Sequence, residues 1–540
     1  MKERSVMCVM VFLLSVGILG MVGVAQEPAL AEQQVLVVGS PDNAITSLDP
    51  AVFLNTTAVE IVRNMFSALL RFRPGQASAP DTVEGDLAQS WDVSADGLTW
   101  TFHLRKGVQW HSGHGEVTSE DVKFSIERVV SIASSYAGDF SGIAETDAPD
   151  RYTVVITLAD PDVFFPMKVA NHRSSFVVSK SAVEEMGDEA FGANPVGSGP
   201  FAFSRWTPND RVVLVRNEEY FRGIPILERI DFLFMGDVNT RVLALKSGDI
   251  HCSNSGLDNE DTVKDLRNSG IIVDVKGFES PITLHYNMTV SPFDDIKVRK
   301  ALAYAINRED FVDFHGQSLC QIQYSMVPPT IFGGVVDGLE PYEYDPQLAQ
   351  TLLEQAGYPN GFSIGEVFMT ERDLYRIPLE IVQANWAKIG VDLEIKVVAH
   401  SEFHSLIREN LNSVVIYAGA RATPDMYLTE FLHSASIVGK ETAKTNFSHY
   451  GDVDADGDGL ADNIDAIIEQ ARRETDPEKA KVLYAMAQMK VAEDLPVFPL
   501  RLTASIQARS PLLDLGHEVY RSTTMWGYLF TEETRILQKK

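Results

Sequence analysis

The stretch 95–129 constrains the fold of this chain more than any other, because its hydrophobic period changes once along it. Apolar and polar residues alternate strictly over 99–104, and a period of two predicts a half-buried strand. A Lys-Gly pair at 106–107 predicts a turn, and the alternation resumes over 108–110, so we expect a hairpin. From residue 118 onward the apolar residues follow helical spacing, which predicts that a helix comes next.

Several short motifs in and around this stretch match one family of exported proteins. They are Trp91, Ser94-Ala95-Asp96-Gly97, Leu104-Arg105, Gly107-Val108, Trp110-His111 and Asp121-Val122. As a set they resemble the hallmark segment of the extracellular solute-binding proteins of peptide/nickel-type ABC importers, the oligopeptide- and dipeptide-binding family. Further blocks that resemble this family extend the match over nearly all of the mature chain. They are Leu48-Asp49-Pro50, Pro195 to Pro200, Leu243 to Asp249 and Val298 to Arg308.

The resemblance implies an α/β chain with the type II periplasmic-binding-protein fold, in the cluster C form with two lobes and an additional third domain. We expect lobe I at 32–80, 192–278 and 502–540, the extra domain at 81–191 and lobe II at 279–501. The implied function is capture of a small solute in the cleft between the lobes and delivery to an ABC permease of the inner membrane. The resemblance thus implies a monomeric binding protein and not an enzyme.

The first residues have the pattern of a secretory signal. Lys2 and Arg4 precede an apolar run that ends near Met21, and two small-residue cleavage sites follow. We expect a signal peptide at 1–25, alternatively 1–31, and a periplasmic protein without a lipid anchor, because no cysteine follows the apolar run. The net charge of −29 argues against a nucleic-acid partner, which requires a basic surface.

Two cysteines, Cys252 and Cys320, remain after removal of the signal. In an exported chain they are expected either to form one disulfide or to be buried free thiols, and the sequence leaves both alternatives open. Neither lies in a spacing typical of a zinc site or a redox motif.

Residues 452–465 are an insertion relative to the family and carry a calcium-loop pattern that resembles those of EF-hands and thrombospondin type 3 repeats. The expected ligands are Asp454, Asp456, Asp458, the carbonyl of Leu460, Asp462 and Asp465. The alternative is a solvated acidic turn. Five carboxylates within twelve residues repel one another without a cation, so the sequence predicts a structural calcium ion. The last ligand is Asp and not the longer Glu, which predicts weak binding.

The specificity segment is expected at 413–428, where Tyr417 ends a buried strand and the next loop faces the cleft. Peptide-binding members of the family hold the peptide's amino group with an Asp, and alignment places Ala420 at that position. Arg421 follows, and its guanidinium matches a carboxylate or phosphate of the solute. The alternative is that Arg421 forms an ion pair with Asp425. We therefore expect an anionic or polyhydroxylated solute, for which Arg421, Tyr417 and Asp425 are candidate ligands.

Asn55 and Thr56 are two further candidate ligand-binding residues, because the loop after the Leu-Asp-Pro turn lies at the cleft in relatives. The alternative is that they only cap the helix that follows them. His111, His114 and Glu116 could suggest a metal site, but their position at the hairpin turn favours a plain turn.

Two other functions compete with solute binding. One is an exported metal-dependent hydrolase that uses the aspartate cluster, and the other is a calcium-dependent surface protein. A calcium loop saturated by protein oxygens leaves no open catalytic position, which argues against the hydrolase. One calcium loop is weaker evidence than family motifs that span the chain, which argues against the surface protein. Both alternatives are therefore disfavoured.

Overall fold

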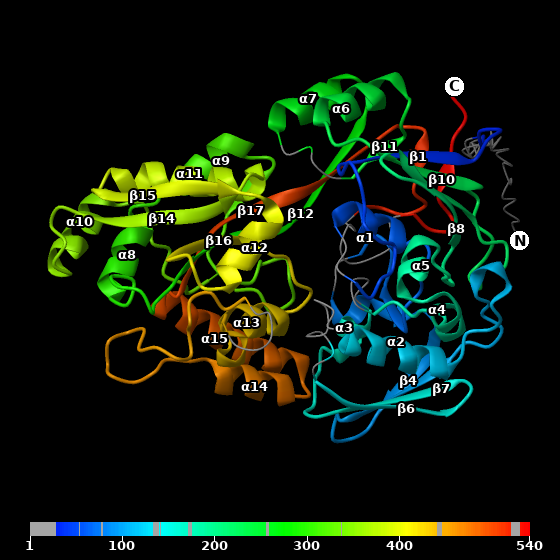
Figure 1. Ribbon diagram of the computed structural model, residues 1–540, viewed down its shortest axis with the longest axis horizontal. Coiled ribbons are helices and arrows are strands. Elements are labelled where there is room, and N and C mark those ends of the chain that lie inside the picture. The colour runs from blue at the N-terminus through cyan, green and yellow to red at the C-terminus, as the bar shows by residue number, and fades with distance from the viewer. Residues whose placement is uncertain are drawn as a thin grey trace, which may run out of the picture.

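The computed structural model is an α/β structure in which two lobes are joined by a pair of long strands (Figure 1). It describes residues 29–52, 55–76, 79–132, 140, 142–170, 175–254, 257, 259–335, 337–439, 445–519 and 530–539. The signal peptide predicted at 1–25, alternatively 1–31, lies outside these residues except for 29–31. Within the described part of the chain, no helix combines the length and the apolar character needed to cross a membrane.

A sheet of nine strands forms the frame of the molecule, in the order β16-β12-β17-β11-β1-β10-β9-β8, with β13 paired to β17 beside this path. These strands are β1 (Val35–Ser40), β8 (Phe201–Thr207), β9 (Arg211–Arg216), β10 (Arg229–Phe234), β11 (Cys252–Ser253), β12 (Ile272–Tyr286), β13 (Cys320–Ile322), β16 (Val414–Ala418) and β17 (Val497–Arg509). β12 and β17 are antiparallel from Ile272 opposite Arg509 to His285 opposite Val497, with register shifts between Lys276 and Ser280. These two strands run from one lobe into the other (Figure 1).

Lobe I contains β1 and β8–β11, where β1 is parallel to β10. Its other elements are α1 (Thr56–Val62), α6 (Val238–Ser247), α7 (Glu260–Asn268) and the pair β18 (Leu513–Asp514) and β19 (Arg535–Ile536). The short pair β2 (Leu70–Phe72) and β3 (Val83–Gly85) spans the predicted boundary between lobe I and the extra domain. Helices α6 and α7 bury Leu245, Val263 and Leu266 in a small core of their own, together with residues of β12 and β17. Apolar side chains on one face of each helix therefore fix them to the frame.

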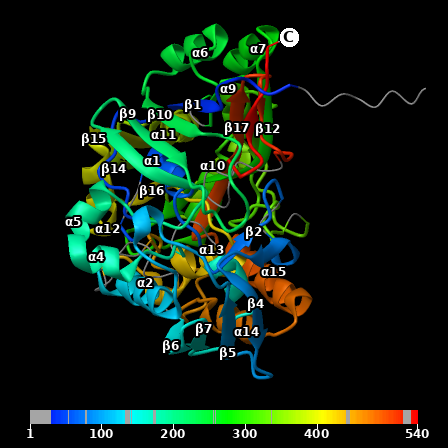
Figure 2. The same cartoon turned by 90° about the vertical axis from the view of Figure 1, so that its right-hand side faces the viewer.

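The extra domain carries a four-stranded sheet of order β4-β5-β7-β6, at the end of the molecule farthest from α6 and α7 (Figures 1 and 2). Its elements are β4 (Ala88–Val93), β5 (Thr99–Leu104), β6 (Ile143–Asp150), β7 (Thr153–Leu158), α2 (Ser119–Ser131), α3 (Phe165–Val169), α4 (Lys180–Met186) and α5 (Asp188–Ala193). The strand predicted at 99–104 is confirmed as β5, with its apolar side chains buried. The hairpin predicted from 108–110 is wrong, because β5 pairs with β4 and β7. Gln109 forms only an isolated bridge with Glu116.

The helix predicted after residue 118 is confirmed as α2. The backbone N–H and the hydroxyl of Thr118 each donate to Asp121 Oδ2 at 2.9 Å. This capping box satisfies donors that the first helical turn leaves free. His111, ahead of the helix, is buried with Nε2 3.0 Å from the Gly199 carbonyl, and burial lowers its pKa to about 4. His111 is thus a packed core residue.

Lobe II contains α8 (Ile296–Tyr304), α9 (Glu309–His315), α10 (Pro346–Gln355), α11 (Asp373–Ala387), α12 (His400–Arg408), α13 (Pro424–Leu432), α14 (Asp465–Arg473) and α15 (Pro477–Asp494), with the parallel strands β14 (Phe362–Thr370) and β15 (Val391–Val398). Trp386 of α11 is fully buried and donates from Nε1 to the Leu302 carbonyl at 3.0 Å. It thereby holds α11 against α8. The domain boundaries given above, including 81–191 and 279–501, stay a prediction.

The two cysteines are both buried free thiols, so the disulfide alternative is not realised. Cys252 lies in β11 and Cys320 in β13. Burial raises the pKa of both thiols, which keeps them protonated and unreactive at neutral pH.

Candidate functional site

Tyr417 lies in β16, at the centre of a group of aromatic rings in lobe II. Its ring centroid is 5.2 Å from that of Phe447, 5.7 Å from Phe431 and 6.3 Å from Tyr375. Only 8% of Tyr417 is exposed. The neighbouring helices α12 and α13 lie on the side of lobe II that faces α1 and α3 (Figure 1). This side of lobe II is where the sequence predicts solute contact.

Arg421 follows β16 and is almost fully buried. Its Nη2 donates to Glu430 Oε2 at 2.5 Å, its Nη1 donates to the Ala420 carbonyl at 2.9 Å, and its guanidinium lies 5.0 Å from the ring centroid of Phe431. Burial alone would lower the pKa of Arg421, but the Glu430 carboxylate raises it above its usual value. The alternative in which Arg421 pairs with Asp425 is therefore wrong, because Glu430 is its partner. Nε of Arg421 is buried and makes no hydrogen bond with any described residue.

Asp425 lies in the first turn of α13, and cations from two other elements surround its carboxylate. Oδ2 accepts from Lys168 Nζ at 2.9 Å, and Oδ1 accepts from Arg472 Nη2 at 2.9 Å. The hydroxyl of Tyr484 also lies 3.3 Å from Oδ1. Burial would raise the pKa of Asp425, but Lys168 and Arg472 hold it well below its usual range. The carboxylate is thus engaged by protein groups.

The same ion pairs join two parts of the molecule. Lys168 belongs to the extra domain, where it also contacts Asp162 at 2.7 Å, whereas Asp425 and Arg472 belong to lobe II. Lys168, Asp162 and Asp425 are all at least seven-eighths buried, with side-chain exposures of 12%, 7% and 3%. The sequence did not indicate Lys168 or Arg472, which are 257 and 47 residues from Asp425. No local pattern links residues at such separations.

Asn55 and Thr56 lie at the start of α1 in lobe I. The Asn55 side chain accepts from the Ala58 backbone N–H at 3.0 Å and donates to the Ala44 carbonyl at 3.0 Å. This is the helix-capping arrangement considered above. Thr56 is the first residue of α1, and its side chain lies outside the described parts of the structure.

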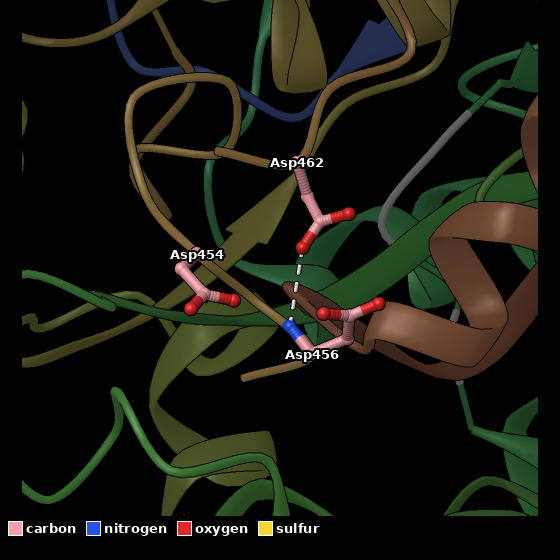
Figure 3. Close-up of side chains that lie close together, drawn as sticks. All are labelled: Asp454, Asp456 and Asp462. Atoms are coloured by element: carbon pink, nitrogen blue, oxygen red, sulfur yellow. Dashed lines mark hydrogen bonds between the residues drawn. The ribbon is translucent and has the colours of Figure 1, made fainter. Parts of the chain in front are cut away.

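Three of the predicted calcium ligands come together in the acidic loop (Figure 3). One carboxylate oxygen each of Asp454, Asp456 and Asp462 lies within 4.8 Å of the other two. The loop backbone shapes this group, because Asp462 Oδ2 accepts from the backbone N–H of Ala455 at 2.9 Å and of Asp456 at 3.1 Å. Asp454 accepts from two glycine N–H groups of the same loop. Three convergent carboxylates form a hard oxygen site of the kind that calcium prefers.

The other predicted ligands lie outside this group. Asp465 accepts from the Ser434 backbone N–H at 3.1 Å and from its hydroxyl, and Asp458 Oδ1 accepts from the Leu460 N–H at 2.8 Å. The side-chain ammonium group of Lys490 also reaches this group, with Nζ 2.8 Å from Asp462 Oδ1. Burial of Asp462 would raise its pKa, but Lys490 and the loop N–H groups hold it low. The structure thus assembles part of the predicted ligand set.

Comparison with known proteins places the chain among bacterial binding proteins. The profile of the bacterial extracellular solute-binding proteins, family 5 Middle, matches residues 82–439. Heme-binding protein A of Haemophilus influenzae is 26% identical over 517 residues, which is 90% of both chains. The dipeptide-binding protein of Escherichia coli is 27% identical over 510 residues, covering 88% of this chain and 91% of that protein.

Two solved structures are similar over almost the whole chain. The periplasmic binding protein MoaA from A. tumefacien R10, in complex with mannopinic acid, is 34% identical with a TM-score of 0.82 and covers 94% of this chain and 100% of its own. The periplasmic binding protein DppA from Helicobacter pylori, in complex with the peptide STSA, is 26% identical with a TM-score of 0.77. It covers 93% of this chain and 98% of its own. The two-lobed type II fold is therefore shared with proteins that bind chemically different solutes.

Proposed function

Because the chain belongs to the bacterial extracellular solute-binding proteins of family 5, we propose that it captures an anionic or polyhydroxylated solute of the opine type between its lobes. The family consists of periplasmic binding proteins of ABC importers. In this chain, a signal peptide directs export, the protein acts as a monomer, and an ABC permease of the inner membrane receives the solute. The family is a class of binding proteins, and we propose no catalytic activity for this member.

The observation that supports this proposal most is that the carboxylates in the segment from β16 to α13 already have partners in the protein. These two carboxylates are Asp425 and Glu430, and both are paired with protein cations. Ala420 stands where an amine-binding Asp is expected. The ammonium group of a peptide would thus be desolvated here without an acceptor, which is costly. The buried Nε of Arg421, in contrast, is a free donor that suits a solute carboxylate.

The comparisons support the same class of solute. The protein bound to mannopinic acid is 34% identical to this chain, whereas the protein bound to the peptide STSA is 26% identical. A carboxylate and several hydroxyl groups suit a site that offers buried N–H donors and aromatic rings such as Tyr417.

Isothermal titration calorimetry tests this solute class. We expect mannopinic acid, as the probe, to bind in a saturable way to the refolded chain, while unmodified dipeptides and tripeptides release no heat of binding. The physical reason is the missing acceptor for a peptide's ammonium group. Refolding in solute-free buffer removes any retained cargo beforehand. Tight binding of unmodified peptides would overturn the proposed solute class, and would leave membership of the family untouched.

We also propose a structural calcium ion at the acidic loop, held by Asp454, Asp456 and Asp462 with backbone and water oxygens. We expect millimolar Ca²⁺ to raise the melting temperature, because an ion that binds only the native state stabilises it. A site of this extracellular kind binds at roughly 10⁻⁴–10⁻³ M. The double variant Asp454→Asn, Asp456→Asn is expected to lose this rise, since it removes two of the three converging carboxylates.

Asp465→Asn is the matched control for the calcium site, because the Asp465 carboxylate is held by Ser434 outside the cluster. We expect this variant to keep the calcium response. Solute affinity is expected to stay the same in all of these variants. An equal response to Ca²⁺ in the double variant and in the unaltered chain would remove the site.

The hydrolase alternative is tested with the same preparation. The hydrolase needs a carboxylate free to act as a base, but Asp462 already contacts Lys490 and two backbone N–H groups. We expect no release of product from ester, amide or glycoside substrates with or without added metal.

A further inference from the structure

Two histidines one helical turn apart lie beside Tyr417, and the function proposed above does not use them. His400 and His404 belong to the first turns of α12, and their Nε2 atoms are 3.2 Å apart. Their rings meet nearly at right angles, with centroids 4.5 Å apart, and the His404 ring lies 6.0 Å from that of Tyr417. The spacing of four residues places both side chains on the same face of the helix.

The hydroxyl of Thr370 fixes the position of the proton on His400. Thr370 Oγ1 donates its only hydrogen to Glu371 Oε2 at 3.0 Å. It therefore acts as an acceptor towards its other two partners, the backbone N–H of Arg372 at 3.2 Å and Nδ1 of His400 at 3.1 Å. Because Nδ1 of His400 must carry a hydrogen to donate it, Nε2 of the same ring carries a lone pair that faces His404.

Both rings are held in the neutral form. Burial, together with the neighbouring His400, Arg408 and Arg372, lowers the pKa of His404 to about 4. Burial also lowers the pKa of His400, as does Arg372, while Glu371 acts in the opposite direction. Imidazole binds metal ions only when it is unprotonated.

We propose that His400 and His404 bind a borderline transition-metal dication, with Zn²⁺ as the simplest case, through their two Nε2 atoms. Zn–N bonds of about 2.0–2.1 Å at a tetrahedral angle place two ligand nitrogens about 3.3–3.4 Å apart. The observed separation of 3.2 Å is close to this value. Histidines at i and i+4 of a helix form a recurrent zinc-binding pair.

The surroundings of the pair suit such an ion. The link from Glu371 through Thr370 to His400 Nδ1 orients the ring, as hydrogen-bond partners of metal-bound histidines do. The ion replaces the hydrogen that His404 Nε2 shares with His400. That hydrogen moves to His404 Nδ1, which is buried and has no hydrogen-bond partner among the described residues. Two histidines leave two tetrahedral positions for water or a solute donor.

Nearby charges set the strength of binding. The guanidinium groups of Arg372 and Arg408, which lower the pKa of His404, also repel a dication. Arg372 is exposed, so solvent screens its charge, and the Glu371 carboxylate attracts the ion. With two protein ligands and these neighbouring charges, we expect zinc to bind more weakly than at a structural site with four protein ligands. Direct titration measures this affinity.

Isothermal titration with Zn²⁺ tests the site on the full chain, produced without a histidine tag. Excess Ca²⁺ in the buffer occupies the acidic loop and prevents Zn²⁺ from binding there. We expect one Zn²⁺ per chain, and a loss of affinity of at least tenfold in His400→Gln and in His404→Gln. His103→Gln is the matched control, because His103 lies in β5 of the extra domain and its Nε2 lies 3.1 Å from Asp92 Oδ2. It is expected to bind as the unaltered chain does.

Thr370→Val separates the metal site from a merely structural histidine pair. It keeps both ligands but removes the hydroxyl that orients His400, so zinc affinity is expected to fall by about 10–100-fold. Circular dichroism of each variant verifies that it is folded. The proposal would be overturned if the unaltered chain took up no Zn²⁺, or if the folded His400→Gln and His404→Gln variants bound it with undiminished affinity. Neither result would bear on the proposed solute class.

Discussion

Replacing Asp425 with alanine is expected to lower the free energy of unfolding by about 3–5 kcal/mol, the usual cost of removing one partner from a buried ion pair. The variant leaves Lys168 and Arg472 without their shared carboxylate, and Lys168 is only 12% exposed. Lys168 retains Asp162, but its ion pair with Asp425, which joins the extra domain to lobe II, is lost. Urea denaturation of the solute-free chain measures the change.

Two further variants make this prediction specific. Asp373→Ala removes a carboxylate that is 71% exposed and pairs with Arg376 on the surface, so we expect a cost below about 1 kcal/mol. The quadruple variant Asp162→Asn, Lys168→Met, Asp425→Leu, Arg472→Met is expected to recover much of the lost stability, because it removes all four charges that meet at that contact. An Asp425→Ala variant as stable as Asp373→Ala would show that the ion pairs across this contact carry no net stability.

The second large effect concerns Arg421 and Glu430. Replacing Arg421 is expected to reduce mainly solute affinity, and replacing Glu430 mainly stability. Arg421→Ala is expected to weaken binding of an anionic solute by about 2–5 kcal/mol, the range for truncating a buried charge pair. Its cost in stability is smaller, because the Glu430 side chain left behind is 34% exposed and regains water. Glu430→Ala is expected to cost more stability than Arg421→Ala, since it leaves the guanidinium, 8% exposed, without its carboxylate.

Calorimetry and urea denaturation of both variants measure these two properties side by side. Leu411→Ala is a suitable control, because Leu411 is exposed and lies ahead of β16. We expect it to change neither property by more than about 0.5 kcal/mol. An Arg421→Ala variant that binds the solute normally would assign Arg421 a purely structural role with Glu430.

What the sequence predicts well is local. The alternation over 99–104 and the capping pattern at Thr118 depend on neighbours a few residues away, and both are confirmed as β5 and α2. The false hairpin at 108–110 shows the limit, because β5 pairs instead with β4, which precedes it, and with β7, about fifty residues further along the chain. Alternation predicts that a strand forms but carries no information about the strand that pairs with it.

In the candidate site, too, local arrangements follow from the sequence and long-range contacts do not. Asp454, Asp456 and Asp462 come together because one short loop positions them, whereas Asp465 is drawn to Ser434, 31 residues away. The partners of Asp425 and Arg421 are likewise set by tertiary packing. The histidine pair at His400 and His404 does have a sequence signal, the spacing of four residues on a helix, but its orientation by Thr370 depends on the fold.

Native mass spectrometry tests most directly whether this chain holds an anionic small solute between its lobes. The full chain, residues 1–540, is expressed and purified without a denaturation step, so that any retained cargo stays bound. We predict a mass above that of the protein alone, and release on denaturation of a small compound that carries a carboxylate and lacks the composition of a peptide. Release of an unmodified dipeptide or tripeptide would contradict the proposed solute class.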